Sequence, residues 1–198
     1  MSSVFNADDD DVPFFGSTVR PEARLTFSPA HTESHVPGRH LNAMLTAEEV
    51  ARVSLDEKAV ENHARAAYMS YGGPAPLPLN RDFISGPLAN FRPHNVREGF
   101  HALYALVRYR QSEEAAHLAE VSIDTILDLW NPVKGWDRER IEGEYGLRFW
   151  RDGTFVTGLA RAIGPLVKFY RTTSYGPALE LAVMLKEKAV DTVFSQEG

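Results

Sequence analysis

The chain has 198 residues, of which 43% are hydrophobic and 24% charged, a composition typical of a folded domain that buries a core. Its formal net charge of -6 gives no overall basic surface for nucleic acid or an anionic membrane. Cysteine is absent, which excludes disulfides and thiolate chemistry. No apolar run is long enough to span a membrane and the N-terminus has no signal-peptide core, so we expect a cytoplasmic protein without a membrane partner.

The first 53 residues show little periodicity and predict an extended, irregular N-terminal arm. Four prolines interrupt helix here, at Pro13, Pro21, Pro29 and Pro37. The four consecutive aspartates 8–11 are typical of a solvated tail. We therefore divide the chain into an arm at 1–53 and an α-hairpin repeat domain at 54–198.

Apolar residues at helical spacing predict five helices in the second part. Ser54 is a plausible cap for the first helix, and Ser112 for the third. In the fourth, the pair Gly164-Pro165 predicts a kink. The expected ranges are about 54–71, 94–110, 112–130, 154–171 and 177–194.

A repeat links two of the predicted hairpins, at about 94–130 and 154–194. Residues 106–110 read Leu-Val-Arg-Tyr-Arg, and residues 166–171 read Leu-Val-Lys-Phe-Tyr-Arg. Each stretch ends a helix and is followed by a short polar turn and a helix rich in Ala and Leu. The offset of about 60 residues indicates αα-hairpin repeats.

This unit resembles the hairpin of six-hairpin glycosidase-like proteins, which are (α/α)6 toroids and include glycoside hydrolases, polysaccharide lyases and sugar epimerases. The resemblance covers residues 94–194 and implies an all-α fold of stacked hairpins. Six such hairpins need about 360 residues, so the chain holds about half of a toroid or is a section of a longer protein. A half toroid predicts a homo-oligomer or a ring-completing partner, which would cover a flank formed by Ala178, Leu181, Ala182 and Leu185.

The start of the second predicted helix is the first candidate site. His94, Arg97 and Glu98 share one helix face, and His101 lies one turn further along it. Glu98 and His94 are candidate proton-transfer groups, while Arg97, Asn95 and His101 are candidate substrate-binding residues. The alternative is a capped helix start, with Asn95 as the cap and Glu98 completing a capping box.

The loop between the two hairpins is the second candidate site, because it holds all three tryptophans and several acids. Indole rings stack on the apolar faces of sugars, and a pair of carboxylates performs glycoside hydrolysis. Trp136 and Trp150 are therefore candidate substrate-binding residues, and Asp152 is a candidate catalytic acid. The alternative is that the tryptophans pack the loop onto the core.

Two further groups carry weaker signals. Arg81 and Asp82 predict a salt bridge that holds the connection before the second helix. The histidines 31, 35 and 40 suggest a metal, but no carboxylate stands at a defined spacing from them. We therefore predict no metal and no cofactor.

These patterns together favour a carbohydrate-active protein, or an incomplete section of one, that acts on an oligosaccharide or a uronate-containing glycan. The residues do not decide whether it is an enzyme, such as a glycoside hydrolase or polysaccharide lyase, or whether it catalyses hydrolysis, elimination or epimerisation. The alternative is a non-catalytic helical-repeat module that binds another protein. A carbohydrate site requires the tryptophans and acids to line one groove, whereas a protein-binding module leaves them pointing apart.

Overall fold

The computed structural model describes residues 4–18, 21–150 and 154–194. These residues are mostly helical, as predicted. Their α-helices, in chain order, are α1 (Val36–Ala51), α2 (Glu57–Tyr71), α3 (Val96–Arg110), α4 (Glu113–Leu129), α5 (Ile163–Thr173) and α6 (Gly176–Phe194). None of the described helices is both long and apolar enough to cross a membrane.

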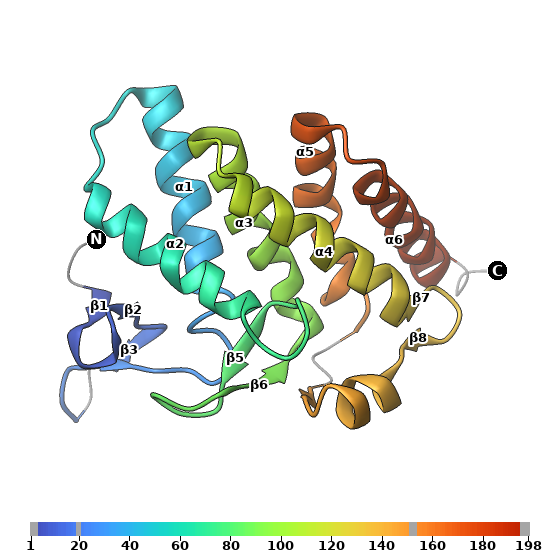
Figure 1. Ribbon diagram of the computed structural model, residues 1–198, viewed down its shortest axis with the longest axis horizontal. Helices are drawn as coiled ribbons and strands as arrows, with labels where there is room; N and C mark the ends of the chain where they lie inside the picture. The colour runs from blue at the N-terminus through green and yellow to red at the C-terminus, as the bar shows by residue number, and fades with distance from the viewer. Residues whose placement is uncertain (1–3, 19–20, 151–153, 195–198) are drawn as a thin grey trace.

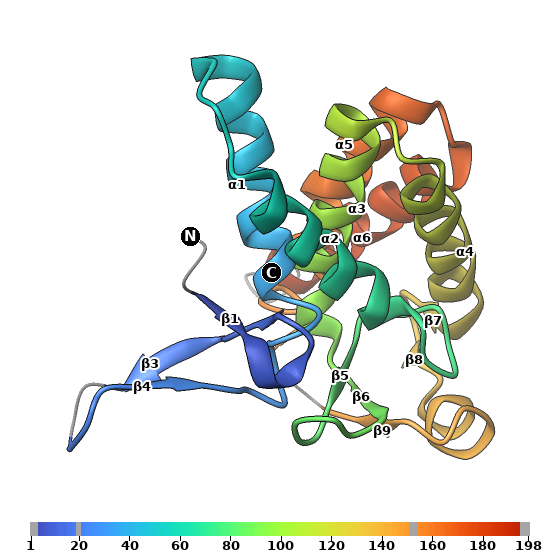
Figure 2. The same cartoon turned by 60° about the vertical axis from the view of Figure 1, so that its left-hand side comes forward.

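The six helices form three consecutive hairpins that lie side by side (Figure 1). Within each hairpin the two helices are in contact, as α1 with α2, α3 with α4, and α5 with α6. Between hairpins, α1 packs on α3 and α3 packs on α5, while α4 packs on α6. Figure 2 shows the same row of helices turned by 60°. The first helices of the hairpins begin 60 and 67 residues apart, so the repeat extends to a third unit at the N-terminal side.

The expectation of an extended arm up to residue 53 is wrong for residues 36–51, which form α1. Pro37 lies in the first turn of this helix, where the missing N–H has no intrahelical acceptor to lose. Leu41, Met44 and Leu45 follow at helical spacing and are buried. The helix that we expected to stand alone before the two hairpins therefore has a partner.

Several predicted helix ends also differ from the observed ones. Asp56, not Ser54, caps α2 by accepting a hydrogen bond from the backbone N–H of Lys58 at 3.1 Å. The fourth predicted helix begins at residue 163 rather than 154, so Pro165 stands in the first turn of α5 and the expected internal kink is absent. Ser112 caps α4 as predicted, accepting from the N–H of Ala115 at 3.1 Å.

Short strands and turns cover the end of the hairpins where α1, α3 and α5 begin (Figure 1). Strands β5, β6 and β9 form one sheet, in which β6 pairs in parallel with β9 and so brings the tryptophan loop beside the chain that enters α3. The strands are β1 (Phe5–Asn6), β2 (Val12–Pro13), β3 (Gly16–Thr18), β4 (Arg24–Thr26), β5 (Leu79–Arg81), β6 (Leu88–Phe91), β7 (Trp130–Asn131), β8 (Gly135–Trp136) and β9 (Arg148–Phe149). The short helical turns are η2 (Ala7–Asp9), η3 (Pro93–Asn95), η4 (Arg140–Glu144) and η5 (Leu159–Ala162).

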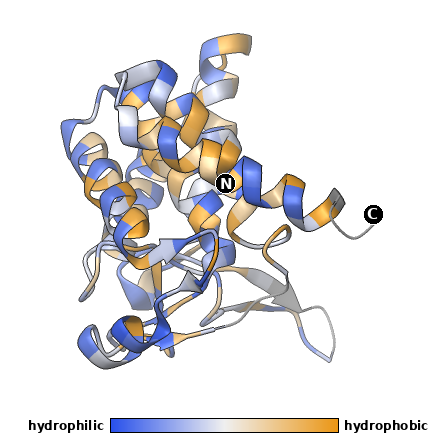
Figure 3. Ribbon diagram, turned by 90° about the vertical axis from the view of Figure 1, so that its right-hand side faces the viewer, coloured by the Kyte–Doolittle hydropathy of each residue, from blue (hydrophilic) through white to orange (hydrophobic). Residues whose placement is uncertain are grey.

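The hydrophobic core runs through all three hairpins, and the hydropathy colouring in Figure 3 shows orange and blue stretches on different sides of the helices. The predicted association flank is wrong in its residues, because α6 buries them completely or almost completely against α4 and α5. These residues are Ala178, Leu181, Ala182 and Leu185. The apolar side chains that α6 exposes are instead Val183, Val190 and Val193.

A buried ionic group fastens the N-terminal segment to the sheet. The guanidinium of Arg81 donates two hydrogen bonds to the carboxylate of Asp9, at 2.8 and 2.6 Å, and one to Glu33 at 2.6 Å. Asp82 pairs with Arg148 instead, so the predicted Arg81–Asp82 salt bridge is wrong. The prediction of a solvated tail is also wrong for Asp9. Its carboxylate is buried and pairs with Arg81, which lies 72 residues away in the sequence.

Candidate functional site

The chain entering α1, α3 and α5 converges at one end of the hairpin row. His35, which precedes α1, contacts Asn95, which precedes α3. His94 in turn accepts a hydrogen bond at 3.0 Å on its Nδ1 from Arg161, which lies in the turn before α5. Three equivalent helix starts therefore contribute side chains to the same place.

Three imidazoles pack together here and form what we call the histidine cluster, His31, His35 and His94. The rings of His35 and His94 are stacked, with centroids 5.1 Å apart, and His31 stands edge-on to both. One nitrogen of each ring lies within 4.8 Å of one nitrogen of each of the others. His35 is buried, whereas His31 and His94 are half-buried. Such a set of donors can hold a metal ion.

Neighbouring polar groups fix the backbone that carries the cluster. Asn95 is fully buried, donates to the carbonyl of Ala30 at 2.7 Å and places its Oδ1 3.3 Å from Nδ1 of His35. Asn80, also fully buried, accepts from the N–H groups of Glu33 and Ser34 at 3.2 Å. The turn that presents His31 and His35 is therefore held from both sides.

The charge state of His35 follows from its surroundings. Burial, together with the positive charge of Arg39 and the neighbouring imidazoles, lowers the pKa of His35 to about 3. Burial likewise lowers the pKa of His101 to about 4, although the nearby Glu98 opposes this shift. Both side chains are therefore neutral at neutral pH.

Glu98 lies at the centre of an ionic group beside the histidine cluster. Its side chain is only 2% exposed, and its Oε1 lies 2.5 Å from Arg97, 3.5 Å from Arg39 and 3.9 Å from Nε2 of His35. None of these contacts has the alignment of a hydrogen bond. Burial, with repulsion from Arg97 and Arg39, lowers the pKa of Arg161. Two guanidinium groups thus contact one carboxylate, and the guanidinium of Arg161 lies within range of their charges, which leaves the group with an excess of positive charge.

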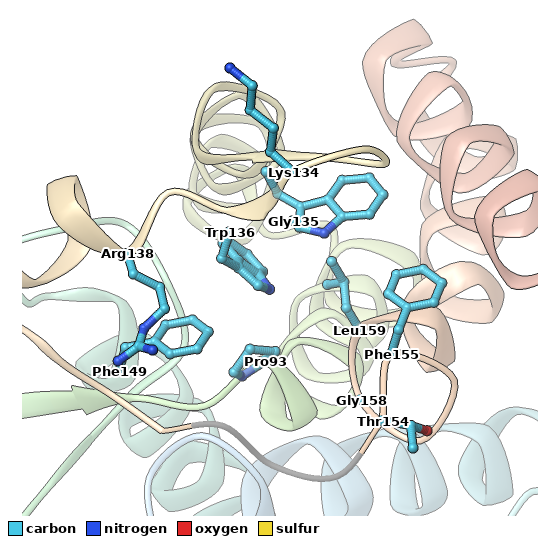
Figure 4. Close-up of a pocket in the computed structure, with 11 residues that line it drawn as sticks. Pro93, Lys134, Gly135, Trp136, Arg138, Phe149, Thr154, Phe155, Gly158 and Leu159 are labelled. Carbon is cyan, nitrogen blue, oxygen red and sulfur yellow. The ribbon is translucent and has the colours of Figure 1, made fainter. Parts of the chain in front are cut away.

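An aromatic pocket of about 440 Å³ is lined by the tryptophan loop, the η3 turn and the turn before α5 (Figure 4). Figure 4 shows Trp136 between Pro93, Leu159 and Phe149, with Arg138 beside Phe149. The guanidinium of Arg138 lies 5.3 Å from the centre of the Phe149 ring. The lining residues are Pro93, Trp130, Lys134, Gly135, Trp136, Arg138, Phe149, Thr154, Phe155, Gly158 and Leu159.

Chain connectivity joins the pocket to the histidine cluster at two points. Pro93 lines the pocket and directly precedes His94. Gly158 and Leu159 line it as well, and Arg161 follows them by three and two residues. The backbone therefore links the pocket to the cluster, and the charged side chains that line the pocket itself are Lys134 and Arg138.

The structure brings most of the predicted site residues to this end of the molecule. Trp136 lines the pocket, and Trp150 lies against Arg92, with the guanidinium 4.2 Å from the ring centre. His94, Asn95, Arg97 and Glu98 lie around the histidine cluster, and His101 lies one turn along α3. Asp152 lies outside the described residues, so its predicted role stays a prediction.

The alternative interpretation of the α3 start as a capping box is wrong. Asn95 makes no side-chain cap hydrogen bond, because its amide is occupied by Ala30 and His35. Glu98 faces Arg97 and Arg39. Asn95 is fully buried and orients His35.

Sequence reasoning missed four members of the site, namely His31 and His35 as partners of His94, and Arg39 and Arg161. A signal for one of them existed, since His35 directly precedes α1 as Asn95 directly precedes α3, 60 residues later. The three histidines whose spacing suggested a metal, His31, His35 and His40, do not all meet, because His94 takes the place of His40 in the cluster. Instead, His40 points to His63, with ring nitrogens 2.9 Å apart.

No protein-family model matches this chain, and neither a curated protein nor a solved structure does. The site therefore has to be interpreted from its own chemistry. It combines an aromatic pocket for flat or ring-shaped apolar surfaces, guanidinium groups for an anion, and imidazoles that can transfer protons or bind a metal.

Proposed function

We propose that this protein is a carbohydrate-active protein that binds an acidic, uronate-containing oligosaccharide at the starts of α1, α3 and α5. The observation that carries the proposal is that the aromatic pocket, which Lys134 and Arg138 also line, shares the η3 turn with the histidine cluster. Trp136 and Phe149 offer stacking surfaces for sugar rings, and Arg138 lies beside them. Arg97 and Arg161 suit the carboxylate of a uronate.

The proposed proton-transfer groups are His94, Glu98 and Asp152. Arg161 donates to Nδ1 of His94, which places the proton of the neutral ring on Nε2 and makes that nitrogen a donor. Glu98 is buried among cations, so it holds Arg97 and Arg39 in position as well as carrying charge. Hydrolysis, elimination and epimerisation all need groups of these kinds.

The repeat supports the proposal that the chain forms half of an (α/α)6 ring. Three hairpins are half of the six that such a ring needs, and we propose that a second copy or a separate partner completes it. Light scattering should show a dimer whose population rises with protein concentration. A monomer at every concentration, with no partner required for binding, would contradict this part of the proposal.

The alternative, a non-catalytic module for protein binding, has some support in the exposed valines of α6. It requires the aromatic residues of the loop to point apart. Trp130, Trp136 and Phe149 instead line a common pocket with Pro93 at the start of α3. We therefore favour the carbohydrate proposal.

The test is a calorimetric titration with a galacturonate tetramer and, in parallel, a glucose tetramer, followed by a panel of other uronate oligosaccharides. We expect the acidic ligands to bind more tightly. Substituting Arg97→Gln should weaken only the acidic ligands, whereas Trp136→Ala should weaken both by roughly 10-fold, as expected for a lost stacking contact.

Val133→Ser is the matched control, since this residue lies in the same loop and is 89% exposed. Trp136→Ala could loosen the loop, so Arg138→Gln, which changes a half-exposed side chain, provides a second variant. The proposal is wrong if no oligosaccharide in the panel binds, or if Arg97→Gln, Arg138→Gln and Val133→Ser bind all ligands equally well. For ligands that bind, His94→Gln and Glu98→Gln should abolish turnover while they preserve the fold.

A further inference from the structure

We propose that His31, His35 and His94 form a binding site for a divalent transition-metal ion. This inference goes beyond the proposed function and does not depend on it. The three residues come from two segments about 60 residues apart, the turn before α1 and the η3 turn before α3. Their donor nitrogens lie within 4.8 Å of one another.

The distances are close to those that a bound metal requires. Zinc binds imidazole nitrogen at about 2.0–2.1 Å, which places the nitrogens of a tetrahedral site about 3.4 Å apart. The nitrogens of the cluster therefore need to approach by no more than about 1.4 Å. His31 and His94 are half-buried and can make this adjustment by side-chain rotation, while His35 stays in place.

Hydrogen bonds behind the ligands already orient two of the rings, as in established metal sites. Nδ1 of His31 lies 3.2 Å from the hydroxyl of Ser28, and Nδ1 of His35 lies 3.3 Å from Oδ1 of Asn95. Asn95 is itself fixed by its hydrogen bond to Ala30. Oδ1 of Asn95 accepts a hydrogen bond from Nδ1–H of His35, which makes Nε2 of His35 the nitrogen that can bind a metal. The Ser28 hydroxyl does the same for His31 in the tautomer that carries its proton on Nδ1.

The donor set selects the kind of ion. Three imidazole ligands suit zinc, cobalt, nickel or copper, whereas magnesium and calcium prefer oxygen ligands. Three protein ligands also leave a coordination position for water or for a bound ligand, the arrangement found in catalytic rather than structural zinc sites.

Arg161 competes with the metal for His94. Its hydrogen bond to Nδ1 requires that nitrogen to be unprotonated. A metal bound at Nδ1 would take the same lone pair, and a metal bound at Nε2 would require the proton to move to Nδ1. Either way the Arg161–His94 hydrogen bond breaks when the metal binds. The positive charge of Arg161 opposes the ion as well.

The experiment is a calorimetric titration of Zn²⁺ into metal-free protein without a polyhistidine tag, at neutral pH. Co²⁺ serves as a spectroscopic probe because its visible spectrum reports tetrahedral nitrogen coordination, and Mg²⁺ serves as the negative control. We expect one Zn²⁺ per chain and no Mg²⁺ binding. His31→Gln and His94→Gln should each weaken Zn²⁺ binding by roughly 100-fold or more, since even the loss of a supporting hydrogen bond costs 10- to 100-fold.

His117→Gln is the matched control, because this histidine is exposed and lies on α4 away from the cluster. Circular dichroism verifies that each variant is folded. Arg161→Met should tighten Zn²⁺ binding by about 10-fold, since it removes both the competing donor and the charge. A Zn²⁺ dissociation constant weaker than about 1 mM, or equal Zn²⁺ binding by His31→Gln, His94→Gln and His117→Gln, would overturn the proposal. Unchanged or weaker Zn²⁺ binding by Arg161→Met would contradict the proposed competition between Arg161 and the metal ion for His94.

Discussion

The N-terminal region through α1 and the two C-terminal hairpins are stabilised in different ways. Residues 4–18 and 21–51 combine the apolar packing of α1 with buried polar and charged groups, among them Asp9, Glu33 and His35. The hairpins α3–α4 and α5–α6 pack mainly through apolar side chains such as Phe100, Ile123 and Phe169. The polar contacts of the first region join residues far apart in the sequence, whereas each hairpin is built from neighbouring segments.

The same difference separates features that a local sequence pattern predicts from features that depend on contacts between distant segments. Apolar spacing and capping residues specify a hairpin locally. A buried ion pair or a histidine cluster depends on which distant segments meet, and no local pattern contains that. The predictions below compare two kinds of substitution. Disrupting a single polar or close contact of the first region should lower the free energy of unfolding strongly, whereas matched substitutions elsewhere should change it little.

The largest effect is expected for Arg81→Met. This substitution leaves the carboxylates of Asp9 and Glu33 buried without a counter-charge, and the loss of one partner of a buried pair typically costs about 3–5 kcal/mol. Arg140→Met is the control, since Arg140 also pairs with two carboxylates but lies on the exposed surface. Chemical denaturation measures both free energies of unfolding. Equal effects of the two substitutions would show that burial of the Arg81 group does not matter.

Gly38→Ala should be the next most damaging change. A Cβ at Gly38 would lie 1.9 Å from the backbone oxygen of Glu98, so α1 and α3 would have to separate. We expect a loss of about 3 kcal/mol in the free energy of unfolding, at the upper end for overpacking. Gly164→Ala in α5 meets nothing within 4 Å and should be neutral or stabilise by about 0.5 kcal/mol. A tolerated Gly38→Ala would mean that the two helices do not approach so closely.

The parts of the fold that the sequence predicts are those with local causes. The ends of α3 and α4, the cap at Ser112 and the start of α6 near Pro177 all follow from apolar spacing, polar turns and terminal residues. Helix α1 was missed because Pro37 was interpreted as a breaker, although a proline in the first turn is compatible with a helix.

The candidate site was predictable in part for the same reason. His94, Arg97 and Glu98 stand out because one helix start presents them together. Their partners His35 and Arg161 could not be assigned, since the contacts span 60 and 67 residues and depend on the packing of three hairpins. Only the extension of the repeat to α1 would have placed them at equivalent positions.

Mild acid should weaken the packing of the first region on α2, through His63 of α2. This side chain is fully buried beside His40, and burial lowers its pKa to about 3. The unfolded chain binds a proton below pH ~6.5 that the folded chain excludes, so stability is lost as the pH falls from 6.5 towards 3. The loss is about 1.4 kcal/mol per pH unit, or roughly 2 kcal/mol between pH 6.5 and 5.

His63→Gln should remove this part of the pH dependence while leaving the contribution of other groups in place. Glu33, whose pKa burial raises, acts in the opposite direction but is common to both proteins. Urea denaturation at several pH values between 5 and 7 gives the two slopes. Parallel slopes for the original chain and His63→Gln would contradict the assignment.

The smallest effect is expected in the α3–α4 hairpin, for Ser112→Ala. The Ser112 hydroxyl accepts from the N–H of Ala115 at 3.1 Å and lies 2.8 Å from the hydroxyl of Tyr68. Loss of a serine cap typically costs about 1 kcal/mol, and Tyr68 is only half-buried, so its hydroxyl can find water. Ser112→Asp keeps an oxygen acceptor at the cap and adds a negative charge that the helix start favours, so it should restore most of the loss. A loss near that of Gly38→Ala would show that the hairpin also depends on a single polar contact, and the contrast between the two regions would fail.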